Sequence, residues 1–156
     1  MKKGLIFLII VLFFSFKANA GLYHVIIGSW VVDKEATLNH FIRSGDWNDL
    51  VEENLKKELE SIQNRQIRIE HDGKDFWIEG EGIIQKSELL VHSSGPNDLD
   101  VDLVQNNQKM KGVFVFYSYN KLRMKFNGRE DLEKFIWQRE GTSEKLNYDL
   151  SREGIG

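Results

Sequence analysis

The stretch IIGSWVVD, residues 26–33, decides the fold. It belongs to an apolar, β-branched segment over residues 24–32 that shows no helical periodicity, so we predict a β-strand there. Within this strand, Gly28 would let a neighbouring backbone or ring approach closely, and Trp30 would bury a large aromatic surface. We interpret the segment as the opening strand of a closed β-barrel.

The residues before this strand have the pattern of a signal peptide. Lys2 and Lys3 precede an apolar run over residues 5–16, and Ala18-Asn19-Ala20 provides a small-x-small cleavage site. The apolar run is shorter than the ~20 residues that a membrane-spanning helix needs. We therefore expect residues 1–20 to be a signal peptide cleaved near Ala20. The mature protein would then be periplasmic or secreted, with no stable membrane span.

The composition limits the partners of such a protein. The chain has no cysteine, so packing alone must hold an exported domain together. Cleavage removes Lys2, Lys3 and Lys17 from the 21 basic residues, so that 18 remain against 24 acidic ones and the formal net charge changes from −3 to −6. An acidic chain is a poor partner for nucleic acid or an anionic membrane. The expected partner is a small hydrophobic ligand or another protein.

A helical insert over residues 34–63 follows the first predicted strand. Asp33 can cap a short helix through its side-chain oxygen, and Gly45 can end that helix. A second helix would begin with Asp46 as its N-cap. Its apolar residues recur at helical spacing and predict one buried stripe, made of Trp47, Leu50, Val51, Leu55, Leu59 and Ile62.

Seven further strands are predicted after the insert, over residues 67–69, 76–78, 89–92, 99–103, 110–119, 122–126 and 134–139. No helical pattern separates them, so we predict an antiparallel meander rather than βαβ units. Short connections favour curling into a closed up-and-down barrel. The predicted fold is therefore mostly β (α+β): an eight-stranded antiparallel barrel over residues 21–140 with the insert after its first strand. A polar tail would follow over residues 141–156.

Gly28-Ser29-Trp30 on the first strand and Arg139 at the end of the last strand resemble the pattern of the lipocalin family, in the loose form of bacterial lipocalin-like proteins. The resemblance implies that Trp30 closes the bottom of the barrel and that Arg139 packs across its ring, a contact that cation–π attraction also favours. The chain departs from the family in its two helices between the first two strands and in lacking a second-motif loop like TDY. The family's ligand contacts are therefore not carried over. The alternative fold is a cystatin-like α+β roll, in which one helix lies across a curved sheet.

The segment VFVFYSYN, residues 113–120, is unusually aromatic. Both faces of this strand are apolar, so both should be covered. We predict that Tyr117 and Tyr119 face inwards and line a cavity, on the same face as Leu122, Met124 and Phe126. The insert would then pack over Phe114 and Phe116 on the outer face. The candidate ligand-binding residues are Trp77, Val115, Tyr117, Tyr119, Met124 and Trp137.

Residues suited to catalysis or metal binding form no recognisable motif. The sequence has no nucleophile elbow, phosphate loop or Cys–His arrangement, and its four histidines lack metal-ligand spacing. The acidic run DLDVD, residues 98–102, lacks the glycine and the terminal glutamate of an EF-hand loop, so we interpret it as a solvated outer strand face. We expect no enzyme activity, no cofactor and no metal.

Two functions remain. The first is an exported, soluble lipocalin-like protein that binds a small apolar or amphipathic molecule, with the insert covering the mouth of the barrel. The second is a ligand-free, envelope-associated interaction or inhibitor module that acts through its surface.

Overall fold

The computed structural model describes residues 24–45 and 47–142. Their strands are β1 (Gly28–Val32), β2 (Gln66–Ile69), β3 (Asp75–Gly80), β4 (Ile83–Ser94), β5 (Asp98–Gln105), β6 (Gln108–Ser118), β7 (Lys121–Phe126) and β8 (Ile136–Arg139). The helices are α2 (Lys34–Arg43), α3 (Asp49–Ser61) and α4 (Glu130–Glu133).

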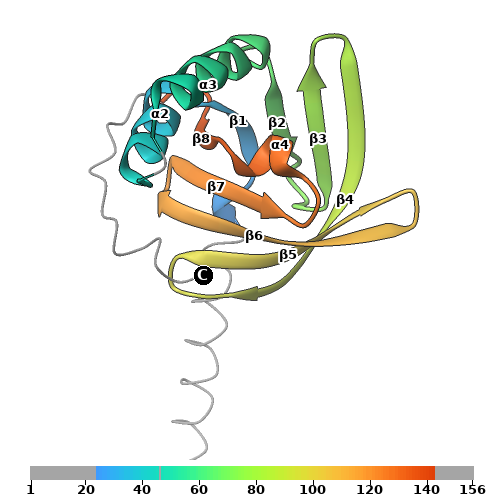
Figure 1. Cartoon of the computed structure of the whole chain (residues 1–156). Helices are drawn as coiled ribbons and strands as arrows, with labels where there is room; N and C mark the ends of the chain where they lie inside the picture. The colour runs from blue at the N-terminus through green and yellow to red at the C-terminus, as the bar shows by residue number, and fades with distance from the viewer. Residues whose placement is uncertain (1–23, 46, 143–156) are drawn as a thin grey trace, which may run out of the picture.

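The strands form one closed antiparallel barrel in up-and-down order (Figure 1). Each strand pairs with its neighbours along the chain, and β8 pairs with β1 to close the sheet. The predicted mostly-β fold with an eight-stranded barrel is confirmed. Because the sheet closes on itself, the alternative of a curved sheet laid across a helix is not observed.

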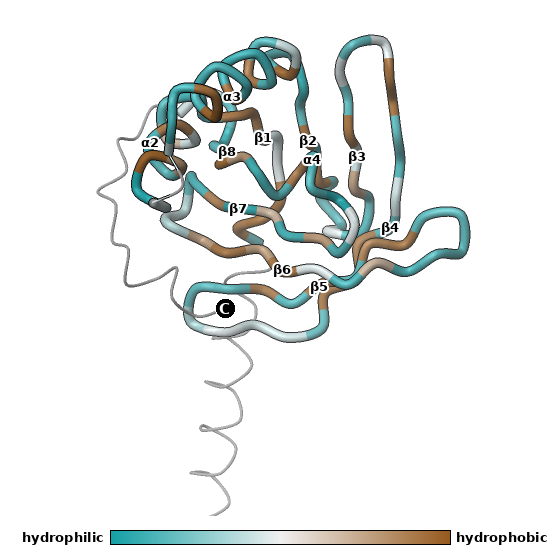
Figure 2. Tube along the Cα trace, in the orientation of Figure 1, coloured by the Kyte–Doolittle hydropathy of each residue, from teal (hydrophilic) through white to brown (hydrophobic). Residues whose placement is uncertain are grey.

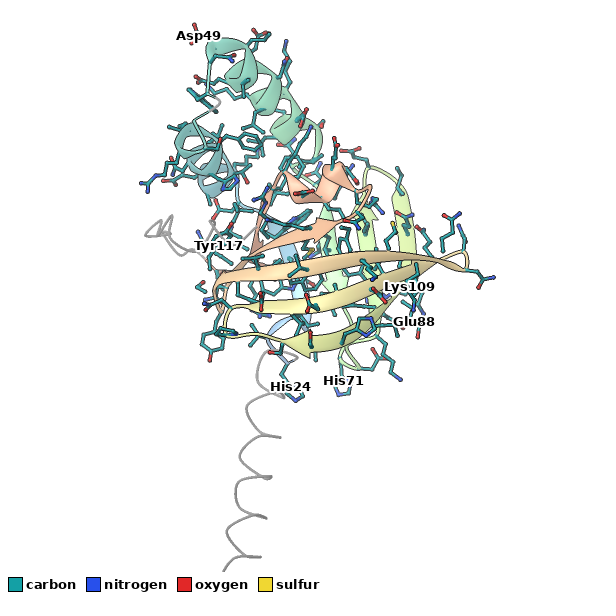
Figure 3. All side chains as sticks on the ribbon, turned by 60° about the horizontal axis from the view of Figure 1, so that its bottom comes forward. His24, Asp49, His71, Glu88, Lys109 and Tyr117 are labelled. Carbon is teal, nitrogen blue, oxygen red and sulfur yellow. The ribbon has the colours of Figure 1, made fainter. Side chains whose placement is uncertain are left out.

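The up-and-down order gives the barrel two different ends. At the insert end lie α2 and α3, the β3–β4 and β5–β6 turns, and α4. At the other end, which we call the Arg139 end, lie the start of β1, the β2–β3, β4–β5 and β6–β7 turns, and Arg139 as the last residue of β8. Figure 3 shows Asp49, at the start of α3, far from His24 and His71 at the opposite end of the molecule.

Alternating residues of the strands fill the inside of the barrel. Figure 2 shows apolar residues along the barrel strands and polar residues at the β5–β6 tip. The inward side chains are buried and form one cluster, and aromatic edges meet faces within it: Phe126 lies 6.0 Å from Phe76 and 5.7 Å from Phe114 between ring centroids. The interior is thus packed with side chains, as in other small barrels.

The face predicted for the aromatic strand is wrong. Phe114 pairs with Met124 and Phe116 pairs with Leu122, and all four side chains are buried inside the barrel. The cause is a register shift between Phe116 and Ser118, because one extra residue in β6 moves the tyrosines to the other face.

The insert packs at its own end of the barrel and does not cover Phe114 and Phe116 from outside, contrary to the prediction. Leu55, Leu59 and Ile62 are buried and belong to the core cluster. Leu50 is 67% exposed, so the predicted stripe is buried only over its C-terminal half. The expected N-cap Asp46 lies outside the described residues, and Asn48 caps α3 by accepting a hydrogen bond from the Val51 amide.

A buried polar group fixes α2 to the barrel wall. Asp33 caps α2 by accepting from the Ala36 amide, and its other carboxylate oxygen lies 2.5 Å from the Lys121 ammonium on β7. Thr37 accepts a hydrogen bond from the Ile136 amide at the start of β8. These contacts join residues 88 and 99 positions apart and hold the insert against β7 and β8. No helix in the described part of the chain is long and apolar enough to cross a membrane.

Candidate functional site

The Arg139 end is organised around one guanidinium. Arg139 on β8 is the cross-strand partner of Trp30 on β1, and its guanidinium carbon lies 4.5 Å from the centre of the Trp30 ring. The Trp30 ring nitrogen donates to the Ile26 carbonyl at 2.8 Å, so the buried indole is satisfied at its polar edge. Burial lowers the pKa of Arg139 below its usual value.

Gly28 makes room for this guanidinium. A Cβ atom at this position would lie 2.8 Å from Arg139 Nη1, and the backbone has a φ of +128°, which side-chain-bearing residues rarely adopt. The structure therefore brings together Gly28, Trp30 and Arg139, the three residues of the sequence motif.

The same guanidinium ties two separate chain segments. Arg139 Nη1 donates to the Ile27 carbonyl at 2.7 Å, and Nη2 donates to the Val25 carbonyl and, at 3.3 Å, to the Tyr119 carbonyl. One side chain therefore links the segment before β1 to the β6–β7 turn.

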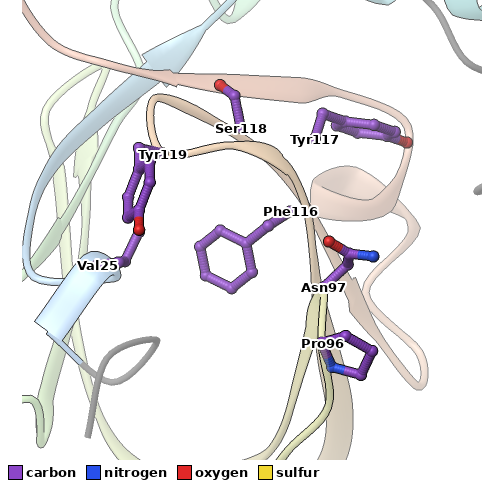
Figure 4. Close-up of a pocket in the computed structure, with 7 residues that line it drawn as sticks. All are labelled: Val25, Pro96, Asn97, Phe116, Tyr117, Ser118 and Tyr119. Carbon is purple, nitrogen blue, oxygen red and sulfur yellow. The ribbon is translucent and has the colours of Figure 1, made fainter. Parts of the chain in front are cut away.

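A pocket of about 250 Å³ lies between the segments that Arg139 joins. Figure 4 shows the Phe116 ring between Val25 and Tyr119 on one side and Pro96 and Asn97 on the other. Phe116 is only 5% exposed, so the inner wall of the pocket is part of the barrel core, whereas Tyr119 is 75% exposed at its rim. Tyr117 and Ser118 complete the lining.

The structure separates the predicted ligand-binding residues into three places. Tyr117 and Tyr119 line this pocket, at the end of the barrel and not inside it. Met124 and Trp137 are buried in the core. Val115 lies on the outer wall.

Trp77 also faces outwards, in a row with Arg68 on β2 and Lys86 on β4. The Arg68 guanidinium and the Lys86 ammonium lie 5.0 and 5.1 Å from the Trp77 ring centre. Both cations also form ion pairs with acidic neighbours, Arg68 with Glu70 and Glu79 and Lys86 with Asp75. The ring therefore supports a network of surface charges on the outside of the sheet.

Sequence reasoning missed five pocket residues: Val25, Pro96, Asn97, Phe116 and Ser118. Pro96 and Asn97 lie in the β4–β5 turn, and the SSGPND stretch indicated that turn. The sequence predicted a closed barrel, but it did not show that this turn would lie beside the β6–β7 turn and the start of β1.

The acidic strand β5 is not fully solvated as predicted. Asp98 and Asp100 are exposed, but Asp102 is only 5% exposed and lies 2.6 Å from His92 Nε2 and 3.5 Å from Lys109 Nζ. The hydrogen bond from His92 is the largest influence, with the charges of His92 and Lys109 acting in the same direction, and together they hold the pKa of Asp102 below its usual 3.8. Within residues 24–45 and 47–142, no three histidine or carboxylate side chains gather where they could hold a metal ion.

Comparison with known proteins found no family model that matches the chain, and no curated protein and no solved structure matches it either.

Proposed function

We propose that this protein is an exported lipocalin-like barrel that binds a small apolar or amphipathic molecule in the pocket at its Arg139 end. The observation that carries the proposal is the pocket of about 250 Å³ whose inner wall is the Phe116 ring. Its size is slightly below the usual range of about 300–1,000 Å³ for small-molecule sites, so the ligand is small. The proposed role is binding, without catalysis.

The lining suits an amphipathic ligand. Val25, Pro96 and Phe116 offer apolar surface, while the Asn97 amide and the Tyr119 hydroxyl offer hydrogen bonds. Tyr119 is held at its backbone by Arg139, yet its side chain is largely exposed and free to pack on a ligand. Such a site combines an apolar body with a few oriented polar groups.

The lipocalin-like part of the proposal rests on the Gly28, Trp30 and Arg139 cluster in a closed eight-stranded barrel. Because side chains fill the interior of the barrel, the proposed site lies at the Arg139 end and not at the centre. The insert then stabilises the other end instead of serving as a lid.

Export is proposed from the pattern of residues 1–20, which lie outside the described residues. N-terminal sequencing of protein from the periplasm or the medium tests it, with a start at or near Gly21 expected. An intact Met1 would contradict export and leave the pocket proposal standing.

The binding proposal is tested with N-phenyl-1-naphthylamine, an apolar fluorescent probe, on the purified protein. Tyr119→Asp places a carboxylate at the pocket rim and is expected to weaken probe binding about tenfold, because an apolar probe would desolvate that charge. Ile84→Asp is the matched control, since Ile84 is 73% exposed on β4 and belongs to the insert end. Equal affinities for the two variants would contradict the proposed site. Extraction of lipid from natively purified protein then identifies the ligand class.

Two neighbouring exposed isoleucines favour a second candidate, the surface interaction module. Ile83 and Ile84 are 59% and 73% exposed just after the β3–β4 turn. Large exposed apolar side chains are a feature of interaction sites, and these two lie on opposite faces of β4 because successive side chains of a strand alternate. If Ile84→Asp abolishes probe binding and Tyr119→Asp does not, this surface replaces the pocket as the binding site.

A further inference from the structure

A second pocket, of about 300 Å³, lies on the outer wall of the barrel where β6 pairs with β7. Its lining includes Lys111 and Val113 from β6, Lys125 from β7, Asn127, and Glu133 from α4. It belongs to the far half of this strand pair, whereas Phe116 and Leu122 are paired near the Arg139 end. The two pockets are therefore separate sites.

The register brings the two lysines together. Val113 pairs with Lys125, and the Asn127 amide donates to the Lys111 carbonyl at 3.0 Å. Lys111 and Lys125 are thus diagonal neighbours on the outer face, a relationship that places Cβ atoms about 7 Å apart. Two long, flexible side chains at this spacing can direct both ammonium groups at one bound group.

Two nearby basic side chains already form ion pairs, whereas Lys111 and Lys125 do not. Lys109 pairs with Asp102 at 3.5 Å, and the Arg123 guanidinium lies 3.9 Å from the Glu133 carboxylate. Among the residues that the structure describes, Lys111 and Lys125 form no ion pair and no side-chain hydrogen bond. The pocket therefore holds two ammonium groups that form no ion pair. Asp102 is the cross-strand partner of Lys111, but it is already engaged by His92 and Lys109.

The rest of the lining is apolar or hydrogen-bonding. Val113 and the methylene stems of the two lysines form an apolar floor. Asn127 adds an amide that can donate to an oxygen. Glu133 carries the opposing charge at the rim, which Arg123 partly offsets.

We propose that this pocket binds a small organic anion, a carboxylate or a phosphate monoester that carries an apolar group. The charged oxygens lie between the Lys111 and Lys125 ammonium groups, and the apolar part lies on Val113. The site is independent of the proposed ligand pocket at the Arg139 end.

The test is an NMR titration of the ¹⁵N-labelled mature chain with butyrate and with phenyl phosphate, and with butanol as the uncharged probe. Saturable amide shifts are expected at residues 111–113 and 125–127 for the anions and not for butanol. Saturation by only one anion identifies the headgroup. Affinity should fall as salt is added, because both charges are accessible to solvent.

Matched variants separate this site from general surface charge. Lys111→Gln and Lys125→Gln are each expected to weaken binding about tenfold, since each removes a hydrogen bond to a charged group. Lys109→Gln removes the same charge from the same strand and face, at a lysine already paired with Asp102, and should weaken binding much less than Lys111→Gln does. Glu133→Gln should strengthen binding about threefold by removing a like charge.

The proposal is overturned by any of three results: no saturable shift with either anion, butanol binding equal to that of butyrate, or equal losses of affinity in Lys109→Gln and Lys111→Gln. All four substitutions are at partly or fully exposed positions, and an unchanged melting temperature confirms that each variant is folded.

Discussion

The guanidinium carbon of Arg139 lies 4.5 Å from the centre of the Trp30 ring, while its two terminal nitrogens donate to backbone carbonyls before β1 and in the β6–β7 turn. One charged side chain thus covers a buried indole and links the segment before β1 to the β6–β7 turn. Arg139 lies where the first and last strands pair, so its contacts help to hold the barrel closed.

The contribution of the Arg139–Trp30 contact to the free energy of unfolding is measurable in a double-mutant cycle. Arg139→Met keeps the aliphatic stem and removes the donors, so it should lower the free energy of unfolding by about 2 kcal/mol or more. Trp30→Ala leaves a cavity and should cost about 3–5 kcal/mol. Because the two groups touch, the double variant should depart from additivity by about 0.5 kcal/mol or more in urea unfolding. Strict additivity would show that the stacking contributes nothing.

Gly28→Ala tests the space reserved for the guanidinium. The new methyl group would meet Arg139 Nη1 at 2.8 Å on a backbone of positive φ, so a loss of about 1–3 kcal/mol is expected. Gly82→Ala is the control, because Gly82 also has a positive φ but no atom within 4 Å of its Cβ position. Thermal unfolding of both variants is sufficient, and similar losses would mean that strain alone explains the glycine.

The sequence predicted the strands well because alternation directly reflects which residues face the core. The number of strands and their short connections predicted that the barrel closes. The motif predicted that Gly28, Trp30 and Arg139 lie together. The sequence failed at Tyr117 and Tyr119 because a single bulged residue inverts a strand and leaves no mark in the hydrophobic pattern. Because both faces of that strand are apolar, its hydrophobic pattern is compatible with either register.

The candidate site was harder to predict for a different reason. Val25, Pro96 and Phe116 come from three segments that meet only through long-range closure. The sequence could identify tyrosines as suitable lining residues, but it could not locate the pocket at the barrel end. The same limit applies to Asp102, whose hydrogen-bond partner His92 lies at a bulge in β4.

The buried pair of Asp33 and Lys121 predicts a strong but recoverable loss of stability. Lys121→Met leaves the Asp33 carboxylate buried without its cation and should cost about 3–5 kcal/mol. Adding Asp33→Asn removes the stranded charge while keeping a good helix cap, so the double variant should regain about 1–3 kcal/mol relative to Lys121→Met. Chemical denaturation of the single and double variants measures the difference. A double variant less stable than Lys121→Met would contradict the account.

Asp102 predicts a stability change at acid pH. Its folded-state pKa lies below the usual 3.8, chiefly because His92 donates to it, so it binds a proton less readily in the folded protein than in the unfolded chain. Its contribution is therefore present above pH 3.8 and is lost as pH falls through the lower folded-state value. Asp102→Asn should lower the melting temperature at pH 6, and the gap from the unsubstituted protein should shrink below about pH 4. A gap that stays constant over this range would show that Asp102 acts through shape and not charge.

The last prediction concerns the insert, whose two halves should differ in their effect on stability. Leu59 is 3% exposed and belongs to the core cluster, while Leu50 on the same helix is 67% exposed. Leu59→Ala should cost about 2–4 kcal/mol because it opens a cavity. Leu50→Ala should change stability by less than about 0.5 kcal/mol, since both helix propensities are high and little area is buried there. If α3 were a lid that opens without the barrel, Leu59→Ala would speed amide exchange in α3 and leave the barrel strands and the global unfolding midpoint unchanged. We expect the midpoint itself to shift, because Leu59 packs in the same core as the strands.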